Sequence, residues 1–250
     1  MRQIKVEFGQ KDYKTEESFK TLRTNIMLSG MDHKVIMITS CTPNEGKSTI
    51  SLSLAKSLAE SGKSVLMIDA DLRKSVLAGK VRATDEVKGL THFLSGLADT
   101  NEVLCRTQEE KLVVIMTGVV PPNPAELLGQ KRFEALVNSA RKVYDYIIID
   151  TPPLGSVIDA AVIARVCDGA VMVLSSGEIS YKFARVVKDQ LEKTKCPILG
   201  VILNKVDMRG DRYYGKYYGK YYGKYYGKYY GNYGEHGNTD SNTKKKRKKK

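Results

Sequence analysis

The chain has 250 residues, a hydrophobic fraction of 42% and a formal net charge of +13. No stretch approaches the roughly 20 apolar residues that a membrane helix needs, and the first thirty residues lack the order of a signal peptide, so the sequence predicts a cytoplasmic protein. The four cysteines and three histidines are scattered, with no CxxC pair. Their spacing therefore argues against a disulfide framework, a zinc site and histidine-based chemistry.

The first expected element is a helix over Thr15–Ser29. Apolar residues recur there at helical spacing, and Glu16 and Glu17 in the first turn suit the positive end of the helix dipole. This helix precedes every predicted strand. We therefore expect residues 1–33 to form a leading helical region that offers a contact between copies of the chain.

Short apolar runs alternate with amphipathic segments over residues 34–208, the expected catalytic domain. The expected strands are Val35–Ile38, Val65–Ile68, Leu112–Met116, Tyr146–Ile149, Ala170–Leu174 and Ile198–Leu203. The expected helices are Lys47–Ser61, Pro124–Val143, Ser156–Val166 and Tyr181–Lys193. This alternation predicts the α/β fold class, a parallel β-sheet with helices on both faces. Ligands of such folds bind beyond the carboxyl ends of the strands.

The composition changes after Met208 to five Tyr-Tyr-Gly units, a polar stretch and the basic run Lys244–Lys250. Residues 211–250 hold 12 Lys and Arg against 3 Asp and Glu, whereas residues 1–210 hold 29 against 25. Frequent glycine and the absence of Leu, Ile and Val prevent a packed core there. We therefore expect residues 209–250 to form a disordered, positively charged tail.

The segment Ser40–Thr49 follows a predicted strand and opens a predicted helix, the setting in which Gly-Lys-Ser forms a phosphate-binding loop. Backbone N–H groups would surround the phosphates, Lys47 would neutralise their β and γ oxygens, and the Ser48 hydroxyl would bind magnesium. Cys41 replaces the usual first glycine of the loop, and the alternative is an ordinary strand-to-helix turn. The expected nucleotide-binding residues here are Pro43, Asn44, Glu45, Gly46, Lys47, Ser48 and Thr49.

Carboxylates follow two of the predicted strands. Val65–Ile68 runs into Asp69 and Asp71, and Tyr146–Ile149 runs into Asp150, all at the edge where the phosphate loop lies. Phosphoryl transfer needs positioning, charge neutralisation and a group that accepts the acceptor's proton. The expected catalytic residues are Lys47, Asp69, Asp71 and Asp150, and the expected magnesium ligands are Ser48, Asp71 and Asp150. We assign Asp69 as the base provisionally, with Asp71 as the alternative.

The tail holds 11 of the 15 tyrosines. Because glycine spacing makes the tail extended and flexible, its tyrosines can reach a γ-phosphate, and each hydroxyl, with a pKa near 10, must lose a proton as it attacks. The alternative is a Tyr/Gly segment that self-associates without modification. The expected phosphorylation sites are Tyr213, Tyr214, Tyr217, Tyr218, Tyr221, Tyr222, Tyr225, Tyr226, Tyr229, Tyr230 and Tyr233.

Three motifs together resemble those of the bacterial tyrosine kinases encoded with capsule and exopolysaccharide synthesis genes. They are GKST preceded by SxxPxx, a strand ending in DxDxR, and IIIDTPP. These kinases are relatives of the MinD/ParA group of P-loop ATPases, and the resemblance covers nearly the whole chain. It implies autophosphorylation with ATP and Mg²⁺, with Asp150 organising magnesium and Asp69 and Asp71 supplying the proton acceptor and a metal contact. It also implies a transmembrane adaptor that activates the kinase, a cognate tyrosine phosphatase, and a place at the inner face of the cell membrane.

Two sequence features bear on the alternatives. Thr42 stands where MinD and ParA ATPases carry their signature lysine, which favours a kinase over a MinD/ParA-like ATPase switch with an unmodified tail. Asn204 begins an NKxD sequence like the guanine-reading motif of GTPases, but IIIDTPP lacks their DxxG. We therefore expect Asn204 near an adenine or capping its strand.

The family's oligomer motif, ExxRxxR, corresponds here to Glu17, Lys20 and Arg23. Lys20 keeps the charge of the first arginine without its bidentate fork, and the alternative is a solvated helix face. The Lys244–Lys250 run is expected to contact anionic lipid at the membrane surface. A nucleic-acid-binding role for the Lys/Tyr tail is the other interpretation.

Overall fold

The computed structural model describes residues 1–9, 12–30, 32–82 and 87–206. Within them, a central sheet has the strand order β1-β6-β7-β4-β8-β3-β9-β10, and β2 and β5 form a separate small ribbon. The strands are β1 (Arg2–Gln3), β2 (Lys5–Val6), β3 (Val35–Ser40), β4 (Val65–Asp69), β5 (Val81–Arg82), β6 (Leu104–Arg106), β7 (Leu112–Ile115), β8 (Tyr146–Asp150), β9 (Gly169–Ser175) and β10 (Ile198–Asn204).

All six predicted strands are confirmed, and they pair in parallel as β7-β4-β8-β3-β9-β10. One edge of the sheet departs from the prediction, because β6 pairs antiparallel to β7 and carries β1 beyond it. The sheet is therefore mostly parallel. Strands of two or three residues are too short to give a periodic signal, which explains why β1, β2, β5 and β6 were not predicted.

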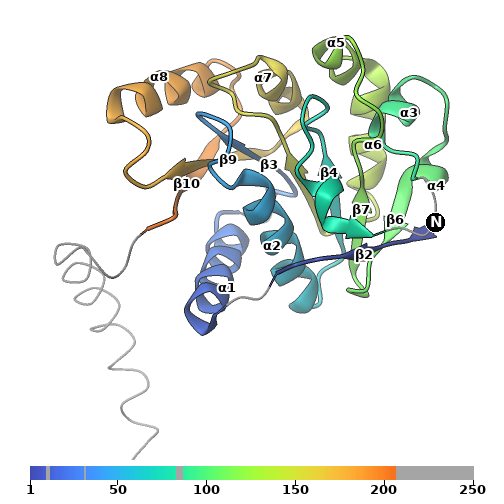
Figure 1. Ribbon diagram of the computed structural model, residues 1–250, viewed down its shortest axis with the longest axis horizontal. Helices are drawn as coiled ribbons and strands as arrows, with labels where there is room; N and C mark the ends of the chain where they lie inside the picture. Colours follow the sequence, from blue (N-terminus) through green and yellow to red (C-terminus); the bar gives the residue numbers. More distant parts are fainter. Residues whose placement is uncertain (10–11, 31, 83–86, 207–250) are drawn as a thin grey trace, which may run out of the picture. The chain divides into compact units, whose positions relative to one another are not determined.

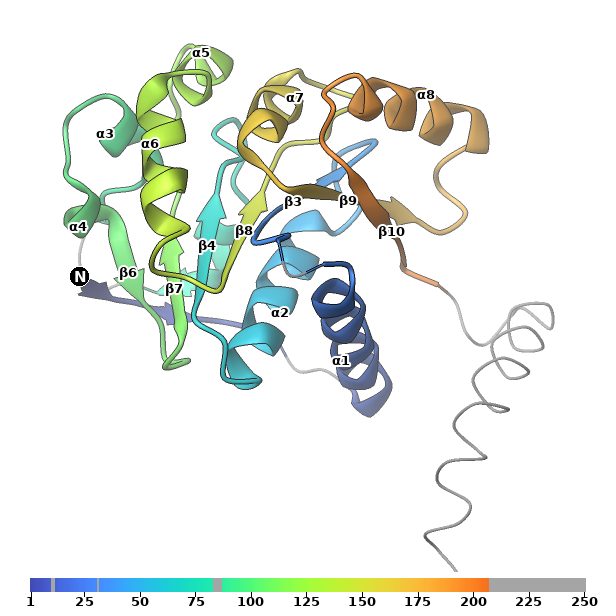
Figure 2. The same cartoon turned by 180° about the vertical axis from the view of Figure 1, so that it is seen from behind.

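Helices cover both faces of the sheet, as predicted (Figures 1 and 2). They are α1 (Tyr13–Leu28), α2 (Lys47–Glu60), α3 (Leu90–Leu94), α4 (Thr100–Val103), α5 (Pro124–Leu128), α6 (Lys131–Ala140), α7 (Asp159–Ile163) and α8 (Tyr181–Glu192), with short 3₁₀ turns η1 (Leu77–Lys80) and η2 (Ala164–Val166). Alternate residues of β3 enter two cores: Val35 and Met37 pack with α5–α8, and Ile36 and Ile38 pack with α1 and α2. A strand buried on both faces reads as a continuous apolar run.

Two predicted helices were too long. The predicted helix Pro124–Val143 ends at Leu128, because Gly129 favours a break and Gln130 has the extended backbone of an N-cap for α6. The predicted helix Ser156–Val166 begins only at Asp159. The N–H groups of the two residues after Gly155 both donate hydrogen bonds to the Pro153 carbonyl, which makes a turn instead of a helix.

The leading helix is confirmed as α1 and belongs to the compact unit Met1–Lys205. Asp12 caps it by accepting a 2.9 Å hydrogen bond from the Thr15 N–H. Its Ile26 is buried in the core that α2 also enters, and its half-buried Phe19 packs against that core. The domain boundaries at 33/34 and 208/209 remain predictions, and the predicted tail lies outside the described residues. In the ranges that the structure covers, no helix combines the length and apolar character needed to cross a membrane.

Candidate nucleotide-binding and catalytic site

The carboxyl ends of three adjacent strands bring the predicted site residues together. β8 lies between β3 and β4 in the sheet (Figure 2). Because these strands are parallel, the loop after β3 lies at the same sheet edge as Asp150, the last residue of β8, and Asp69, the last residue of β4. Asp69 and Asp150 are directly opposite each other in the sheet register. Lys47, at the start of α2, is close enough to attract both Asp71 and Asp150. The four residues predicted to be catalytic therefore share one site.

The loop after β3 takes its shape from two residues with left-handed backbone. Asn44 has φ 67° and Gly46 has φ 93°, and a Cβ on Gly46 would lie 2.2 Å from Asn204 Nδ2. Glycine is therefore required at position 46. Cys41, by contrast, is not among the described residues with positive φ, which explains why the usual glycine is dispensable there.

A buried carboxylate braces this loop from inside. Glu45 is fully buried, and its Oε1 accepts hydrogen bonds from the Thr42 N–H (2.5 Å) and hydroxyl (3.1 Å). Its Oε2 accepts from the Ser175 N–H at the end of β9 (2.9 Å). Asn204 Nδ2 donates to the Glu45 carbonyl (2.8 Å). Glu45 and Asn204 thus tie the loop to β9 and β10, a role that the sequence analysis did not predict.

Asp150 has an acceptor oxygen without a partner. Its Oδ1 accepts a 3.1 Å hydrogen bond from the hydroxyl of Ser51, whereas its buried Oδ2 has no hydrogen-bond partner among the described residues. Burial raises the pKa of Asp150 to about 6, opposed by the neighbouring Ser48 hydroxyl and the positive charge of Lys47. An unsatisfied buried carboxylate oxygen beside a serine hydroxyl fits a hard divalent cation such as Mg²⁺.

Protein side chains alone do not complete a metal site in the described part of the chain. No group of three or more His, Cys, Asp or Glu side chains is placed there to hold a metal ion. Mg²⁺ commonly uses one or two protein ligands and takes its other ligands from water and substrate phosphates. The donor set of Ser48 and Asp150 therefore suits magnesium that arrives with a nucleotide.

Asp69 is enclosed by hydroxyl groups. Its Oδ2 accepts hydrogen bonds from Ser75 Oγ (2.5 Å) and Thr117 Oγ1 (3.4 Å), and the residue is fully buried. Burial, followed by repulsion from Asp150, raises the pKa of Asp69 to about 8. Burial also raises the pKa of Asp71, against the attraction of Lys47. Both aspartates could be predicted from the sequence, but the hydroxyl partners of Asp69, Ser75 and Thr117, could not.

The arginine of the DxDxR motif fastens the same loop to α7. Arg73 Nε donates to Asp159 Oδ2 at 2.8 Å and Arg73 Nη2 donates to Asp159 Oδ1 at 2.9 Å, while Asp159 is fully buried. Two parallel hydrogen bonds to a carboxylate fix the geometry as well as the charge. The pair therefore holds the segment after Asp71 in place.

We expect Arg73→Met to lower the free energy of unfolding by about 1.5–3 kcal/mol, because it leaves the buried Asp159 carboxylate without its charged partner. Urea unfolding of the purified protein measures this change. Arg165→Met, at an exposed arginine of η2 directly after α7, is the matched control. Equal stability of the Arg73 variant and the unmodified protein would contradict the assignment.

Known proteins are similar to this chain over most of the compact unit Met1–Lys205. A family model described as an AAA domain matches residues 33–191. The chain is 48% identical over 194 residues to tyrosine-protein kinase CpsD of Streptococcus agalactiae, covering 78% of this chain and 85% of that protein. The kinase domain of Escherichia coli tyrosine kinase ETK is similar at a TM-score of 0.73 and 35% identity, over 80% of this chain and 78% of that one. MinD of Pyrococcus horikoshii, complexed with Mg-ADP, matches at a TM-score of 0.60 and 26% identity, over 71% and 72% of the two chains.

Proposed function

The chain belongs to the family of bacterial tyrosine-protein kinases, and we propose that it uses ATP and Mg²⁺ to phosphorylate tyrosines of its own tail. The observation that carries this proposal is the buried Oδ2 of Asp150, which has no hydrogen-bond partner in the described part of the chain. It lies beside Lys47 and Ser48, with Asp69 at the neighbouring strand end. Such an arrangement supplies cation binding, phosphate binding and proton acceptance at one edge of the sheet. The kinase reading agrees with the resemblance drawn from the sequence motifs.

Each residue has a distinct part in the proposed reaction. Residues 43–49 surround the phosphates, and residues 44–49 donate backbone N–H groups to them, since Pro43 has none. The Lys47 ammonium neutralises charge on the β and γ oxygens. Ser48 and Asp150, with Asp71, would hold Mg²⁺, which would supply further positive charge beside the phosphates. In the nucleotide-free protein Asp69 holds a proton at neutral pH. The charge of a bound Mg²⁺ would favour the ionised form of Asp69, which can accept the proton of the attacking tyrosine hydroxyl, with Asp71 as the alternative base.

The proposed acceptors are the 11 tyrosines of the tail, from Tyr213 to Tyr233. Each phosphotyrosine carries about −1.5 to −2 charges, so about five or six would offset the positive excess of residues 211–250. We propose that phosphorylation therefore releases the tail from acidic partners, including a neighbouring active site. Salt-dependent self-association that does not change with phosphorylation would argue against this release.

The first test is intact mass and site mapping after incubation with ATP and Mg²⁺, with the cytoplasmic segment of the adaptor present. We expect multiple phosphates on Tyr213–Tyr233, and none in Lys47→Met, which loses the phosphate-binding ammonium. ATP hydrolysis without phosphotyrosine under the same conditions would instead identify a MinD/ParA-like ATPase switch. Thr42 stands at the position of the signature lysine of the MinD and ParA ATPases, and it donates hydrogen bonds to Glu45 within the same loop. This favours the kinase over the ATPase switch.

The proposed setting is the inner face of the cell membrane, in control of capsular or exopolysaccharide synthesis. The proposed partners are a transmembrane adaptor that activates the kinase and a cognate tyrosine phosphatase. The Lys244–Lys250 run, which lies outside the described residues, would add attraction to anionic lipid of about 1 kcal/mol per basic residue.

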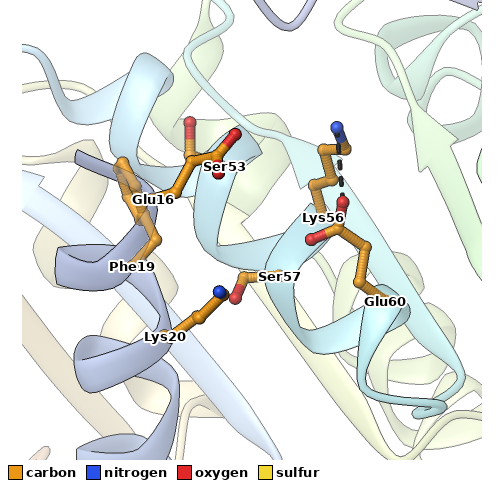
Figure 3. A pocket seen from close by; sticks show the side chains of 7 residues that line it. All are labelled: Glu16, Phe19, Lys20, Ser53, Lys56, Ser57 and Glu60. Atoms are coloured by element: carbon orange, nitrogen blue, oxygen red, sulfur yellow. Dashed lines mark ion pairs between the residues drawn. The ribbon is translucent and has the colours of Figure 1, made fainter. Parts of the chain in front are cut away.

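We further propose that copies of the chain associate through α1. Glu17 pairs with Lys20 at 2.6 Å, and Arg23 Nη1 donates to the Ser57 carbonyl of α2 at 2.9 Å, so these side chains already have partners within one copy. A pocket lies between α1 and α2 (Figure 3), lined by Glu16, Phe19, Lys20, Ser53, Lys56, Ser57 and Glu60. Its mixed charges and aromatic ring suit a polar side chain from a neighbouring copy.

Lys20→Glu would break the pair with Glu17 and place three acidic side chains on one turn of α1, since Glu16 is adjacent. We expect it to weaken self-association by roughly tenfold, because the variant presents a negative charge where the proposed contact has a positive one. Sedimentation velocity over a concentration series measures the change. Lys14→Glu makes the same charge change at an exposed position of α1, and an equal loss in both variants would contradict a specific contact.

A further inference from the structure

A second lysine reaches the phosphate loop from a distant part of the chain. Lys80 ends the 3₁₀ turn η1, and its Nζ donates a 2.7 Å hydrogen bond to the hydroxyl of Thr49. Thr49 directly follows Ser48 in the first turn of α2 and is exposed. The Lys80 ammonium therefore lies beside the residues proposed to bind phosphate and magnesium.

The backbone around Lys80 is anchored on both sides. The Lys80 carbonyl accepts a 2.8 Å hydrogen bond from the Glu7 N–H, and β5, which follows directly, pairs with β2. On the other side, Leu77 is 1% exposed in the core beneath α2. The lysine is thus presented by a fixed segment, so its reach toward Thr49 requires no large movement of the chain.

The charge of Lys80 is poorly compensated. Its hydrogen-bond partner is a neutral hydroxyl, and Lys80 forms no ion pair with any residue that the structure describes. Partial burial lowers the pKa of Lys80, and the negative charge of Asp150 opposes this effect. A half-buried ammonium without an anionic partner gains from an anion that enters the site.

We propose that Lys80 is a second phosphate-binding cation of this kinase, acting with the Thr49 hydroxyl on the phosphates that ADP and ATP share. The inference rests on the nucleotide site proposed above. Lys47 serves the β and γ oxygens from the end of the loop, and Thr49 lies two residues further into the helix. We therefore assign Lys80, beside Thr49, to the α- and β-phosphates. Because ADP and ATP share these phosphates, removing the Lys80 ammonium should lower the affinity for both nucleotides by the same factor.

The test is equilibrium binding of ADP and of ATP, each with Mg²⁺, to the full chain by a fluorescent-nucleotide titration. We expect Lys80→Met to weaken both by at least tenfold and by similar factors. We expect Lys80→Arg, which keeps the charge and a donor, to stay within about threefold of the unmodified protein. Lys74→Met removes an equal charge from an exposed position of the same segment and should bind as the unmodified protein does.

Unchanged ADP and ATP binding by Lys80→Met would overturn the inference while leaving the nucleotide site intact. An equal loss of nucleotide affinity in Lys74→Met would also overturn the inference, because the loss of any nearby positive charge would then explain the result. Loss of ATP binding alone would reject the assignment to the shared phosphates. No nucleotide binding by the unmodified protein would refute the site itself. The melting temperature of each nucleotide-free variant, and rescue by Lys80→Arg, separate a binding role from a structural one.

Discussion

Asp69→Asn should lower the rate of tyrosine phosphorylation by roughly 10²–10⁴-fold while the protein still binds ADP, if Asp69 is the proton acceptor. Asparagine keeps the size of the side chain and can still accept the hydrogen bond from Ser75, but it cannot take a proton at neutral pH. Single-turnover phosphorylation beside ADP titration measures the two effects separately. Asp71→Asn is the paired variant: a large loss there with a rate within threefold in Asp69→Asn would assign the base to Asp71.

Asp69→Asn should also change how the stability of the protein depends on pH. The folded state raises the pKa of Asp69 from an ordinary value near 3.9 to about 8, so between these values the folded protein holds a proton that the unfolded chain releases. The free energy of unfolding of the nucleotide-free protein therefore falls as the pH rises through this window. Asp69→Asn removes that loss. We expect its melting temperature at pH 8 to exceed that of the unmodified protein by several degrees, and the difference to shrink toward pH 5.

The main elements of the site could be predicted because each has a local signal. Buried strands appear as apolar runs, Gly46 and Lys47 mark the loop, and Asp69 and Asp150 end apolar runs. Parallel neighbours then bring the strand ends to one edge of the sheet without any further information. Residue type and position within the chain were sufficient to predict these features.

The supports of the site could not be predicted, since they depend on contacts between distant segments. Glu45 has the appearance of an exposed loop residue, yet it is buried against β9, 130 positions along the chain. Ser75 and Lys80 lie in a stretch with a 3₁₀ turn and no strong period, and only the folded chain shows that they reach Asp69 and Thr49. Long-range pairing of this kind leaves no pattern in a single sequence.

Glu45→Ala should disrupt the architecture of the phosphate loop and lower both stability and nucleotide affinity. The carboxylate accepts three hydrogen bonds, from two groups of Thr42 and from the Ser175 N–H, and its removal leaves the buried Ser175 N–H without a partner. One unsatisfied buried donor costs about 1–3 kcal/mol, and the cavity left by the side chain adds to this. We expect the melting temperature to fall by roughly 5–10 °C and ADP affinity to fall by at least tenfold.

Differential scanning calorimetry and ADP titration test this expectation, with Glu134→Ala, on the exposed face of α6, as the matched control. Glu45→Gln refines the argument. Its amide keeps the volume and one acceptor but turns an NH₂ group toward either Thr42 or Ser175, where two donors would face each other. Nucleotide affinity should therefore fall in Glu45→Gln although the cavity is absent. If Glu45→Gln bound ADP as the unmodified protein does, the loop would owe its shape to Gly46 and the strand ends, and the buried carboxylate would serve stability alone.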